Sequence, residues 1–299
     1  MVTKGSGALT KVSVHIITYN QKDFIGEAID SALAQDYPDL EVVVADDAST
    51  DGTADIVADY ARRYPDNVVA LLNPSNVGIT ANSNVGLWAC SGDLIAFMGG
   101  DDVLLPGKIS AQVAWFAGRP RRVLCGHQVE VFYEDRSRPP HPLVRCLRSG
   151  TGAAMLVRHL PFGATSVMVR ADRVPAHGFD EQLPVVSDQL MWVEIVREDG
   201  EYGYVDGTLA RYRRHDANVT NNPLDNIRDI DRYLQIVGER FPSFAPAVRF
   251  AVTRRLHYGV GVALLNVGRK AEARREFAAA IRREPLFVKA WARALQTFL

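Results

Sequence analysis

The 299-residue sequence has few cysteines, almost no net charge and no long apolar run, and each absence excludes a class of protein. Its three cysteines, Cys90, Cys125 and Cys146, are widely spaced and match no zinc-binding pattern, which favours a reducing compartment. A formal net charge of −1 gives no sign of a nucleic-acid partner. The N-terminus has no apolar leader, and the longest weakly polar run, 256–267, is too short to span a bilayer. We therefore expect a cytoplasmic protein.

Charge is unevenly distributed along the chain. Residues 249–299 contain 11 Lys and Arg but three acids, a net charge of +8, so the remainder carries −9. An acidic body with a basic tail indicates two regions with different roles.

Short apolar, β-branched runs alternate with segments of helical periodicity in the first third of the chain. The expected strands are 12–18, 40–45, 68–72 and 94–98, and the expected helices lie between them, with Thr53 as the N-cap of the second. Regular alternation of strand and helix is typical of a doubly wound α/β half with a parallel sheet.

The pattern loosens after a further helix near residue 106. Strands are expected at 123–125, 129–133, 202–205 and 209–213, with a basic loop at 134–149 and a helix from Ser187. From residue 224 onward the sequence predicts helices, either as a cap on the α/β body or as a single helical hairpin of the tetratricopeptide type. One of these helices has an apolar stripe formed by Ala273, Phe277, Ala280 and Ile281. We expect one α/β domain over 1–222 and a helical region over 223–299.

The segment DLIAFMGGDD at 93–102 ends a buried strand with two glycines and two adjacent carboxylates, Asp101 and Asp102. Open α/β sheets bind their ligands at the carboxyl ends of the strands. Adjacent acids repel each other and lose hydration, and a nearby cation relieves both effects. A plain polar turn that caps the next helix is the alternative interpretation.

Four segments keep the order and spacing of one known family: VSVHIITYNQKDFIGEAIDSALAQDYPDLEVVVADDASTDGT, NVGITANSNVGLWACSGDLIAFMGGDD, GFDEQLPVVSDQLMW and YRRHDANVT. Over roughly residues 11–220 the sequence resembles the family 2 glycosyltransferases of the bacterial surface-polysaccharide type, which are inverting enzymes of the GT-A fold. The resemblance implies an α/β fold with a Rossmann-like mixed sheet flanked by helices, followed by a C-terminal helical extension. It also implies transfer of a sugar from a nucleoside-diphosphate donor to a hydroxyl of a glycan or lipid-linked glycan, in polysaccharide biosynthesis for the cell envelope.

The resemblance also implies a nucleotide-sugar site built by several loops. Its residues would be Thr18, Tyr19, Asn20, Asp46, Asp47, Asn76, Gly78, Asn84, Asp101 and Arg214. Asp46 or Asp47 would accept a hydrogen bond from the base or ribose, and acceptance from an imide N–H favours UDP or dTDP. Capping of the loop alone is the alternative for these two acids. For Asn84, bracing a loop is as good an interpretation as direct contact.

In the family, the acidic pair corresponds to a metal motif. By resemblance Asp102 would coordinate Mn²⁺ or Mg²⁺ between the two phosphates, with His215 as the second ligand, and the metal would neutralise charge on the leaving diphosphate. The acid that often stands two residues before Asp102 is Gly100 here, so we expect weaker metal affinity in the free protein. Arg213 and Arg214 are alternative phosphate ligands. The same loop contains Asn218 and Thr220.

Inversion by a single in-line displacement requires a general base for the acceptor hydroxyl. The resemblance points to Asp188, although the family motif commonly has two acids where this chain has Ser187 and Asp188. A helix N-terminus would keep the carboxylate ionised, and an ordinary acid in a first helical turn is the alternative. Asp180 and Glu181 are the next candidates, and Trp192 suits the core better than a sugar platform.

Three rival functions are considered, of which a pure interaction module built on the helical tail would need more repeats than this chain supplies. A catalytically inactive nucleotide-sugar binder or scaffold of the same fold is the alternative, because Gly100 and Ser187 replace family acids. A nucleotidyltransferase would need a glycine-rich basic phosphate loop near the N-terminus, which the sequence lacks. The basic tail suggests peripheral contact with an anionic membrane at its inner face, or with a diphospholipid acceptor.

Overall fold

The computed structural model describes residues 10–136, 138–143, 149–159, 162–216, 218 and 227–298. The chain divides into two compact units. The first comprises 1–152, 161–181 and 194–215, and the second comprises 153–160, 182–193 and 216–299. Two segments from inside the expected α/β domain thus group with the C-terminal helices, while the boundary at residue 222 stays a prediction.

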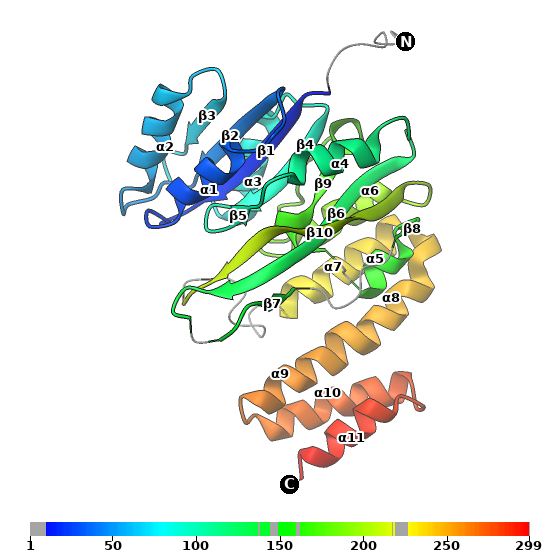
Figure 1. The fold of residues 1–299 in the computed structure, drawn as a ribbon. Coiled ribbons are helices and arrows are strands. Elements are labelled where there is room, and N and C mark those ends of the chain that lie inside the picture. The colour runs from blue at the N-terminus through cyan, green and yellow to red at the C-terminus, as the bar shows by residue number, and fades with distance from the viewer. Residues whose placement is uncertain are drawn as a thin grey trace. The chain divides into compact units, whose positions relative to one another are not determined.

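The first unit is built on a mixed sheet, as the sequence predicted (Figure 1). Its longest path runs β3-β2-β1-β4-β9-β6-β10-β5. The parallel strands are β1 (Val12–Thr18), β2 (Leu40–Asp46), β3 (Val68–Leu72) and β4 (Leu94–Gly99). The others are β5 (Val103–Leu104), β6 (Arg122–Tyr133), β7 (His141–Pro142), β8 (Gly150–Thr151), β9 (Met168–Arg170) and β10 (Glu201–Arg214). Strand β9 is antiparallel to β4 and β6, whereas β6 and β10 are parallel to each other.

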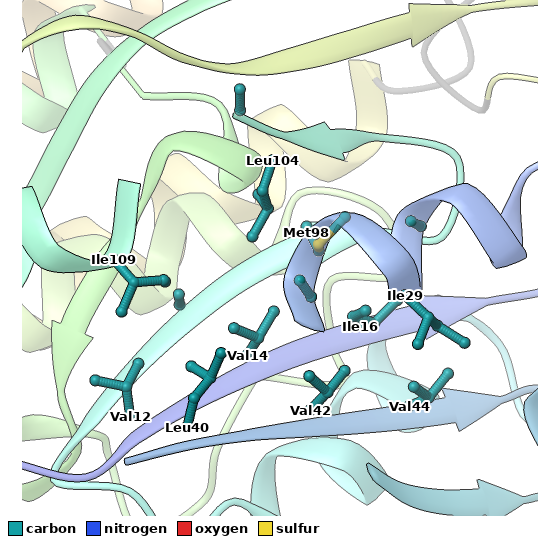
Figure 2. Close-up of a cluster of buried hydrophobic side chains, with 14 of the residues drawn as sticks. Val12, Val14, Ile16, Ile29, Leu40, Val42, Val44, Met98, Leu104 and Ile109 are labelled. Atoms are coloured by element: carbon teal, nitrogen blue, oxygen red, sulfur yellow. The ribbon is translucent and has the colours of Figure 1, made fainter. Parts of the chain in front are cut away.

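Helices α1 (Ile25–Leu33), α2 (Thr53–Arg63), α3 (Ile79–Ala89) and α4 (Lys108–Phe116) follow in the predicted order. Alternate residues of β1 and β2 pack against α1 in a dry core, and Figure 2 shows Ile16, Val42 and Val44 beside Ile29. The other face of β1 meets α3 so closely that a Cβ on Gly86 would lie 2.5 Å from His15 Nε2. Only glycine permits this approach.

The two long strands differ from the prediction. The sequence predicted two short strands in place of β6 and two in place of β10, but each is continuous, and β10 has 14 residues. Between Tyr204 and Ala210 the β10–β6 register shifts twice, and Gly207 lies there with φ of 105°. A bulge therefore places turn-forming residues inside a strand.

The described helices of the second unit are α5 (Ala154–His159), α7 (Ile227–Arg240), α8 (Ala245–Ala251), α9 (Tyr258–Asn266), α10 (Lys270–Arg283) and α11 (Val288–Gln296). Helix α6 (Ser187–Val196) begins in this unit at the predicted residue. A π-helical segment, Val252–His257, joins α8 to α9, and Gly268 (φ 78°) turns the chain between α9 and α10. The predicted apolar stripe is the buried face of α10. Within the described residues, no helix has the length and apolar character needed to cross a membrane.

The buried His15 makes the stability of the fold depend on pH. Burial lowers its pKa from 6.5 to about 4, and its Nε2 lies 3.0 Å from the carbonyl oxygen of Ser83. Because the unfolded chain binds this proton more readily, the stabilisation is complete above pH 6.5 and is lost as pH falls towards 4. We expect the wild type to lose about 2 kcal/mol more than His15→Asn between pH 7.5 and 4.5. Urea denaturation at both values measures this, and parallel pH dependences of the two proteins would contradict it.

Candidate active site

The strands β1, β2 and β4 end at one edge of the sheet. Thr18 stands opposite Asp46, and Ile17 stands opposite Gly99. The segments that leave this edge carry most of the residues selected from the sequence. The register therefore brings together side chains that are more than 80 positions apart.

Asp47 binds the loop that precedes α3. Its carboxylate accepts hydrogen bonds from the backbone N–H groups of Val77 (2.8 Å) and Gly78 (2.9 Å), and its carbonyl oxygen accepts one from Asn76 Nδ2 (3.2 Å). Asp47 is buried, so the loop-capping interpretation describes what the structure contains. Gly78 has φ of 90°, which explains glycine at the start of α3.

The neighbouring segment is bound in the same way. Asp46 is buried and accepts a hydrogen bond from the Ser49 backbone N–H (2.9 Å). Asn20, in the left-handed conformation (φ 52°), accepts one from the Thr50 N–H (2.9 Å). The hydroxyl of Thr18 donates to Gln21 (2.9 Å). Tyr19, which follows β1, is exposed by half, and an aromatic ring so exposed could stack on a base.

Asp101 and His215 form the most distinctive pair of the first unit. His215 Nε2 lies 2.9 Å from Asp101 Oδ2, and its ring packs on Phe24 with centroids 4.9 Å apart. Asp102 is buried and accepts hydrogen bonds from the Thr165 hydroxyl and from the Arg213 backbone N–H (3.1 Å). Burial, and after it the charge of Asp101, raises the pKa of Asp102 to about 8. The predicted acidic pair thus has one member beside His215 and one directed into the protein.

Gly100 lies in tight packing. A Cβ at this position would lie 2.9 Å from the side chain of Thr18 and 2.6 Å from Gln21 Oε1. An acid at residue 100, as the family commonly has, would displace the Thr18–Gln21 hydrogen bond. Glycine at residue 100, where the family commonly has an acid, is therefore accompanied by close packing of Thr18 and Gln21 around it.

Arg213 braces the site in this structure, and the alternative that it binds phosphate stays a prediction. Its side chain is buried, its Nε donates to the carbonyl oxygen of Asp101 (2.8 Å), and its terminal nitrogens pair with Glu27 and Glu134. It ties α1 and the end of β6 to the strand that leads to His215. Arg214 has its guanidinium 5.4 Å from the centre of the Tyr212 ring.

Asn84 braces a loop, one of the two roles predicted for it. Its side-chain oxygen accepts a hydrogen bond from the Phe179 N–H (2.7 Å), and its Nδ2 donates to the Phe179 carbonyl (3.0 Å) and to Glu181 (3.2 Å). Gly178 must be glycine, because its φ is 69° and a Cβ would lie 2.3 Å from Asn84 Oδ1. Asp180 is buried in the same loop.

Asp188 belongs to the second unit, in the first turn of α6. Its carboxylate accepts a hydrogen bond from the Gln189 N–H (2.7 Å). Burial raises the pKa of Asp188 to about 6, against the lowering effects of that hydrogen bond and of Arg255. A carboxylate with a raised pKa is suited to proton abstraction near neutral pH. Trp192 is buried, which confirms its predicted place in the core.

Arg255 near Asp188 has no counterpart in the sequence-based prediction. Its terminal nitrogens donate to the Val157 carbonyl (2.9 Å) and to Gln189 Oε1 (2.5 Å), and its guanidinium lies 5.5 Å from the ring centre of Tyr233. Arg255 lies in the π-helical segment, a distortion that occurs frequently at functional sites. That distortion leaves no local sequence signal, and the tail lies outside the family resemblance.

The residues at the sheet edge suit a metal that arrives with its substrate. Asp101 and His215 offer one oxygen and one nitrogen donor, whereas Asp102, whose pKa burial raises to about 8, would have to lose its proton before it bound a cation. No group of three or more His, Cys, Asp or Glu side chains that could hold a metal occurs in the described part of the chain. This donor set fits Mg²⁺ or Mn²⁺ bound mainly by phosphates and water. Asn218 is buried nearby in sequence, and Thr220 lies outside the described residues.

Comparison with known proteins agrees with this architecture. A family model described as Glycosyl transferase family 2 matches residues 13–171, more than half of the chain. The chain therefore belongs to glycosyl transferase family 2.

Its relatives include proteins with and without an assigned activity. The uncharacterized protein Rv1520 of Mycobacterium tuberculosis is 36% identical over 210 residues, which are 68% of this chain and 59% of that protein. EpsE of Bacillus subtilis, provisionally named a glycosyltransferase, is 34% identical over 161 residues, 54% of this chain and 56% of EpsE. The matches thus span less than two thirds of either relative.

Solved structures show the fold. TarS 1–349 of S. aureus in complex with UDP-GlcNAc superposes with a TM-score of 0.66 at 17% identity, covering 96% of this chain and 89% of that one. The mannosyltransferase PcManGT of Pyrobaculum calidifontis, in complex with GDP-Man and Mn²⁺, gives 0.59 at 21% identity, covering 96% and 81%. The predicted GT-A fold is confirmed.

Proposed function

We propose that this chain is an inverting glycosyltransferase that moves a sugar from a nucleoside-diphosphate sugar to a hydroxyl of a glycan or lipid-linked glycan. The observation that carries the proposal is the Asp101–His215 pair, at the sheet edge where β1, β2 and β4 end. Family membership supports the reaction class. TarS and PcManGT were each solved with a nucleotide sugar, which supports a donor of that type for this chain.

The donor would lie along the loops that Asp46 and Asp47 hold. Asp47 fixes the backbone around Gly78, and Asn20 fixes the loop after β2, so these loops are ordered before a ligand arrives. Preorganised loops reduce the entropic cost of binding. Tyr19 would stack on the base, and Asp46 or Asp47 would meet its edge or the ribose. We favour UDP or dTDP.

Asp102 and His215 would hold a divalent ion, with Asp101 beside them at the ribose or sugar and Arg214 as a further cation for the diphosphate. When bound, the ion supplies positive charge against the charge that develops on the leaving diphosphate. Arg213 keeps this group in place through Asp101 and Asp102. The residues that would hold the ion are thus themselves held by the buried Arg213, which pairs with the half-exposed Glu27 and Glu134.

Asp188 would act as the general base. It would accept the proton of the acceptor hydroxyl while the oxygen attacks C1 on the face opposite the diphosphate, which inverts the anomeric carbon. Its pKa of about 6 leaves it mostly ionised at neutral pH and still basic. Arg255 positions the segment by binding Gln189, the next residue.

A nucleotide-sugar binder without catalytic activity is the second candidate. Gly100 and Ser187 both stand where the family commonly has acids, and a side chain at residue 100 would have to displace Thr18 and Gln21. Such a protein would bind the donor without releasing its nucleoside diphosphate.

A thermal-shift panel tests the donor site. A ligand that binds only the folded state raises the melting temperature by mass action. We expect UDP or dTDP, and their sugars, to raise it in Mn²⁺ or Mg²⁺ and to do so less in EDTA. Asp101→Asn should lose most of this shift, whereas Asp66→Asn, an exposed acid before the opposite end of β3, should keep it.

The panel also has outcomes that contradict parts of the proposal. If the rise in melting temperature persists in EDTA, the diphosphate is bound by Arg214 and His215 without a metal. A shift with GDP alone would overturn the preference for UDP or dTDP. No shift with UDP, GDP, CMP or dTDP would overturn the donor site.

A further inference from the structure

Helix α11 presents its large apolar side chains away from the protein. Its buried positions hold small residues, chiefly Ala290, while Ala294 is half-buried. Large apolar residues on and beside it are 50–90% exposed; they are Leu286, Val288, Trp291, Leu295 and Phe298, and we call them the outer face. Val288, Trp291 and Leu295 recur at intervals of three and four, so they form one stripe. This is the reverse of an ordinary surface helix, whose large apolar residues face the core.

The helix is fixed in this orientation by contacts at both ends. Phe287 is buried against Tyr258, with ring centroids 4.9 Å apart. At the other end, Arg274 of α10 donates to the Thr297 hydroxyl and to its carbonyl oxygen, both at 2.9 Å. Trp291 donates its indole N–H to the Pro285 carbonyl (2.9 Å). Turning the outer face inward would break these contacts, so its exposure is built into the unit; Figure 1 shows α11 beside α10.

Positive charge surrounds the outer face. Arg282 and Arg283 end α10 and are exposed, as is Lys289 on α11. The three acids of 249–299 pair with other bases: Glu272 with Arg269, Glu276 with His257 and Glu284 with Arg254. With 11 Lys and Arg in this region, a positive excess remains after these pairs.

The apolar stripe and the nearby positive charge together indicate which kind of partner binds the outer face. A second copy of the chain would bring the same bases against these bases in a symmetric contact, which is repulsive. An apolar stripe with a tryptophan, flanked by Lys and Arg, is characteristic of helices that lie in the interface of an anionic bilayer. Nine residues extend roughly 13 Å, far less than a bilayer core, so α11 would lie along the surface.

We propose that the outer face of α11, together with Arg282, Arg283 and Lys289, docks the protein on anionic lipid bilayers. The apolar side chains enter the headgroup region, and the bases attract the anionic headgroups. The sequence predicted membrane contact from the charge of the tail, and the structure gives that contact a definite surface. The inference holds whether or not the chain transfers sugars.

Vesicle flotation of the full chain tests the proposal. The vesicles are phosphatidylcholine alone, or phosphatidylcholine mixed with phosphatidylglycerol. We expect binding to the mixed vesicles only, weakened by salt. The double substitution Trp291→Ser with Leu295→Ser should lower the partition coefficient by about tenfold or more, and Arg283→Glu with Lys289→Glu should lower it similarly.

Val267→Ser is the matched control, because Val267 is also an exposed apolar residue but lies at the turn after α9. It should bind vesicles as the wild type does. All substituted side chains are exposed, but Trp291→Ser also removes the hydrogen bond to Pro285, so the melting temperature of each variant is compared with the wild type to exclude misfolding. Point substitutions are preferable to deletion of 249–299, which would also remove Arg255 beside Gln189.

Three results would overturn the proposal. The first is a wild type that does not float with anionic vesicles, and the second is equal binding by the outer-face variant. The third is a wild-type dimer in sedimentation that is absent from the outer-face variant, because the outer face would then be an interface between two copies of the chain. Nucleotide thermal shifts on the same proteins keep a failure of the donor site distinct from a failure of docking.

Discussion

Asp188→Asn is expected to lower the rate of sugar transfer by roughly a thousandfold, because a general base contributes about two to four orders of magnitude. Asparagine keeps the shape of the side chain and can still accept the hydrogen bond from the Gln189 N–H. Donor binding in the thermal-shift panel should therefore be unchanged. Release of nucleoside diphosphate from the donor measures the loss.

The pH dependence of the same reaction gives an independent measure. With a pKa of about 6, Asp188 is protonated at pH 5, so kcat/KM should rise with pH and level off above about 7. The effect of the same carboxyl group on folding stability has the opposite dependence on pH. Because the folded-state pKa lies above 3.8, stability falls as pH rises from 4 to 6, and Asp188→Asn should escape this fall.

Substitution of the two other candidate bases, Asp180 and Glu181, provides the result that could contradict this assignment. Asp180→Asn and Glu181→Gln should each leave most of the activity, since Glu181 accepts a hydrogen bond from Asn84 in a structural loop. If either abolishes transfer while Asp188→Asn does not, the base has been assigned to the wrong residue.

Arg213→Met is expected to lower the free energy of unfolding by about 1–3 kcal/mol. The guanidinium is buried and donates to the carbonyl oxygen of Asp101, so its removal leaves that oxygen without a donor, whereas its partners Glu27 and Glu134 are about half exposed and remain solvated. Because the same strand leads to His215, nucleotide binding should weaken as well. Urea denaturation and the thermal-shift panel measure the two effects.

Arg211→Met is the matched control in the same strand. Arg211 pairs with Glu130 at 3.0 Å, but both side chains are more than a third exposed. Exposed pairs contribute little, so this variant should lose about 1 kcal/mol or less and keep its nucleotide binding. Equal losses in the two variants would refute the special role of Arg213.

The elements that the sequence predicted correctly are those in which local pattern and tertiary environment agree. Strands β1, β2 and β4 are rich in apolar residues because they are buried on both faces of the sheet. The sequence predicted two strands, 202–205 and 209–213, in place of β10, and the residues between them lie in a bulge. A bulge depends on the neighbouring strand, so the segment alone cannot reveal it.

The candidate site was likewise predictable from the sequence only in part. Resemblance selected Asp101 and His215, and the fold brings them to 2.9 Å across more than 100 residues. Resemblance did not reveal that Arg213 is buried between carboxylates, because the sequence gives the charge of a side chain but not its partners. Arg255 was missed because it lies beyond the family match and in an irregular helical turn.

Titration calorimetry with a nucleoside diphosphate and Mn²⁺ tests the central claim most directly. The claim is that the edge formed by β1, β2 and β4 binds the diphosphate of a sugar donor together with a divalent ion held at Asp102 and His215, beside Asp101. We predict saturable binding of UDP or dTDP to the wild type and to Asp66→Asn, weakened by about tenfold or more in Asp101→Asn. Absence of binding to the wild type, or equal affinity in all three proteins, would contradict the claim.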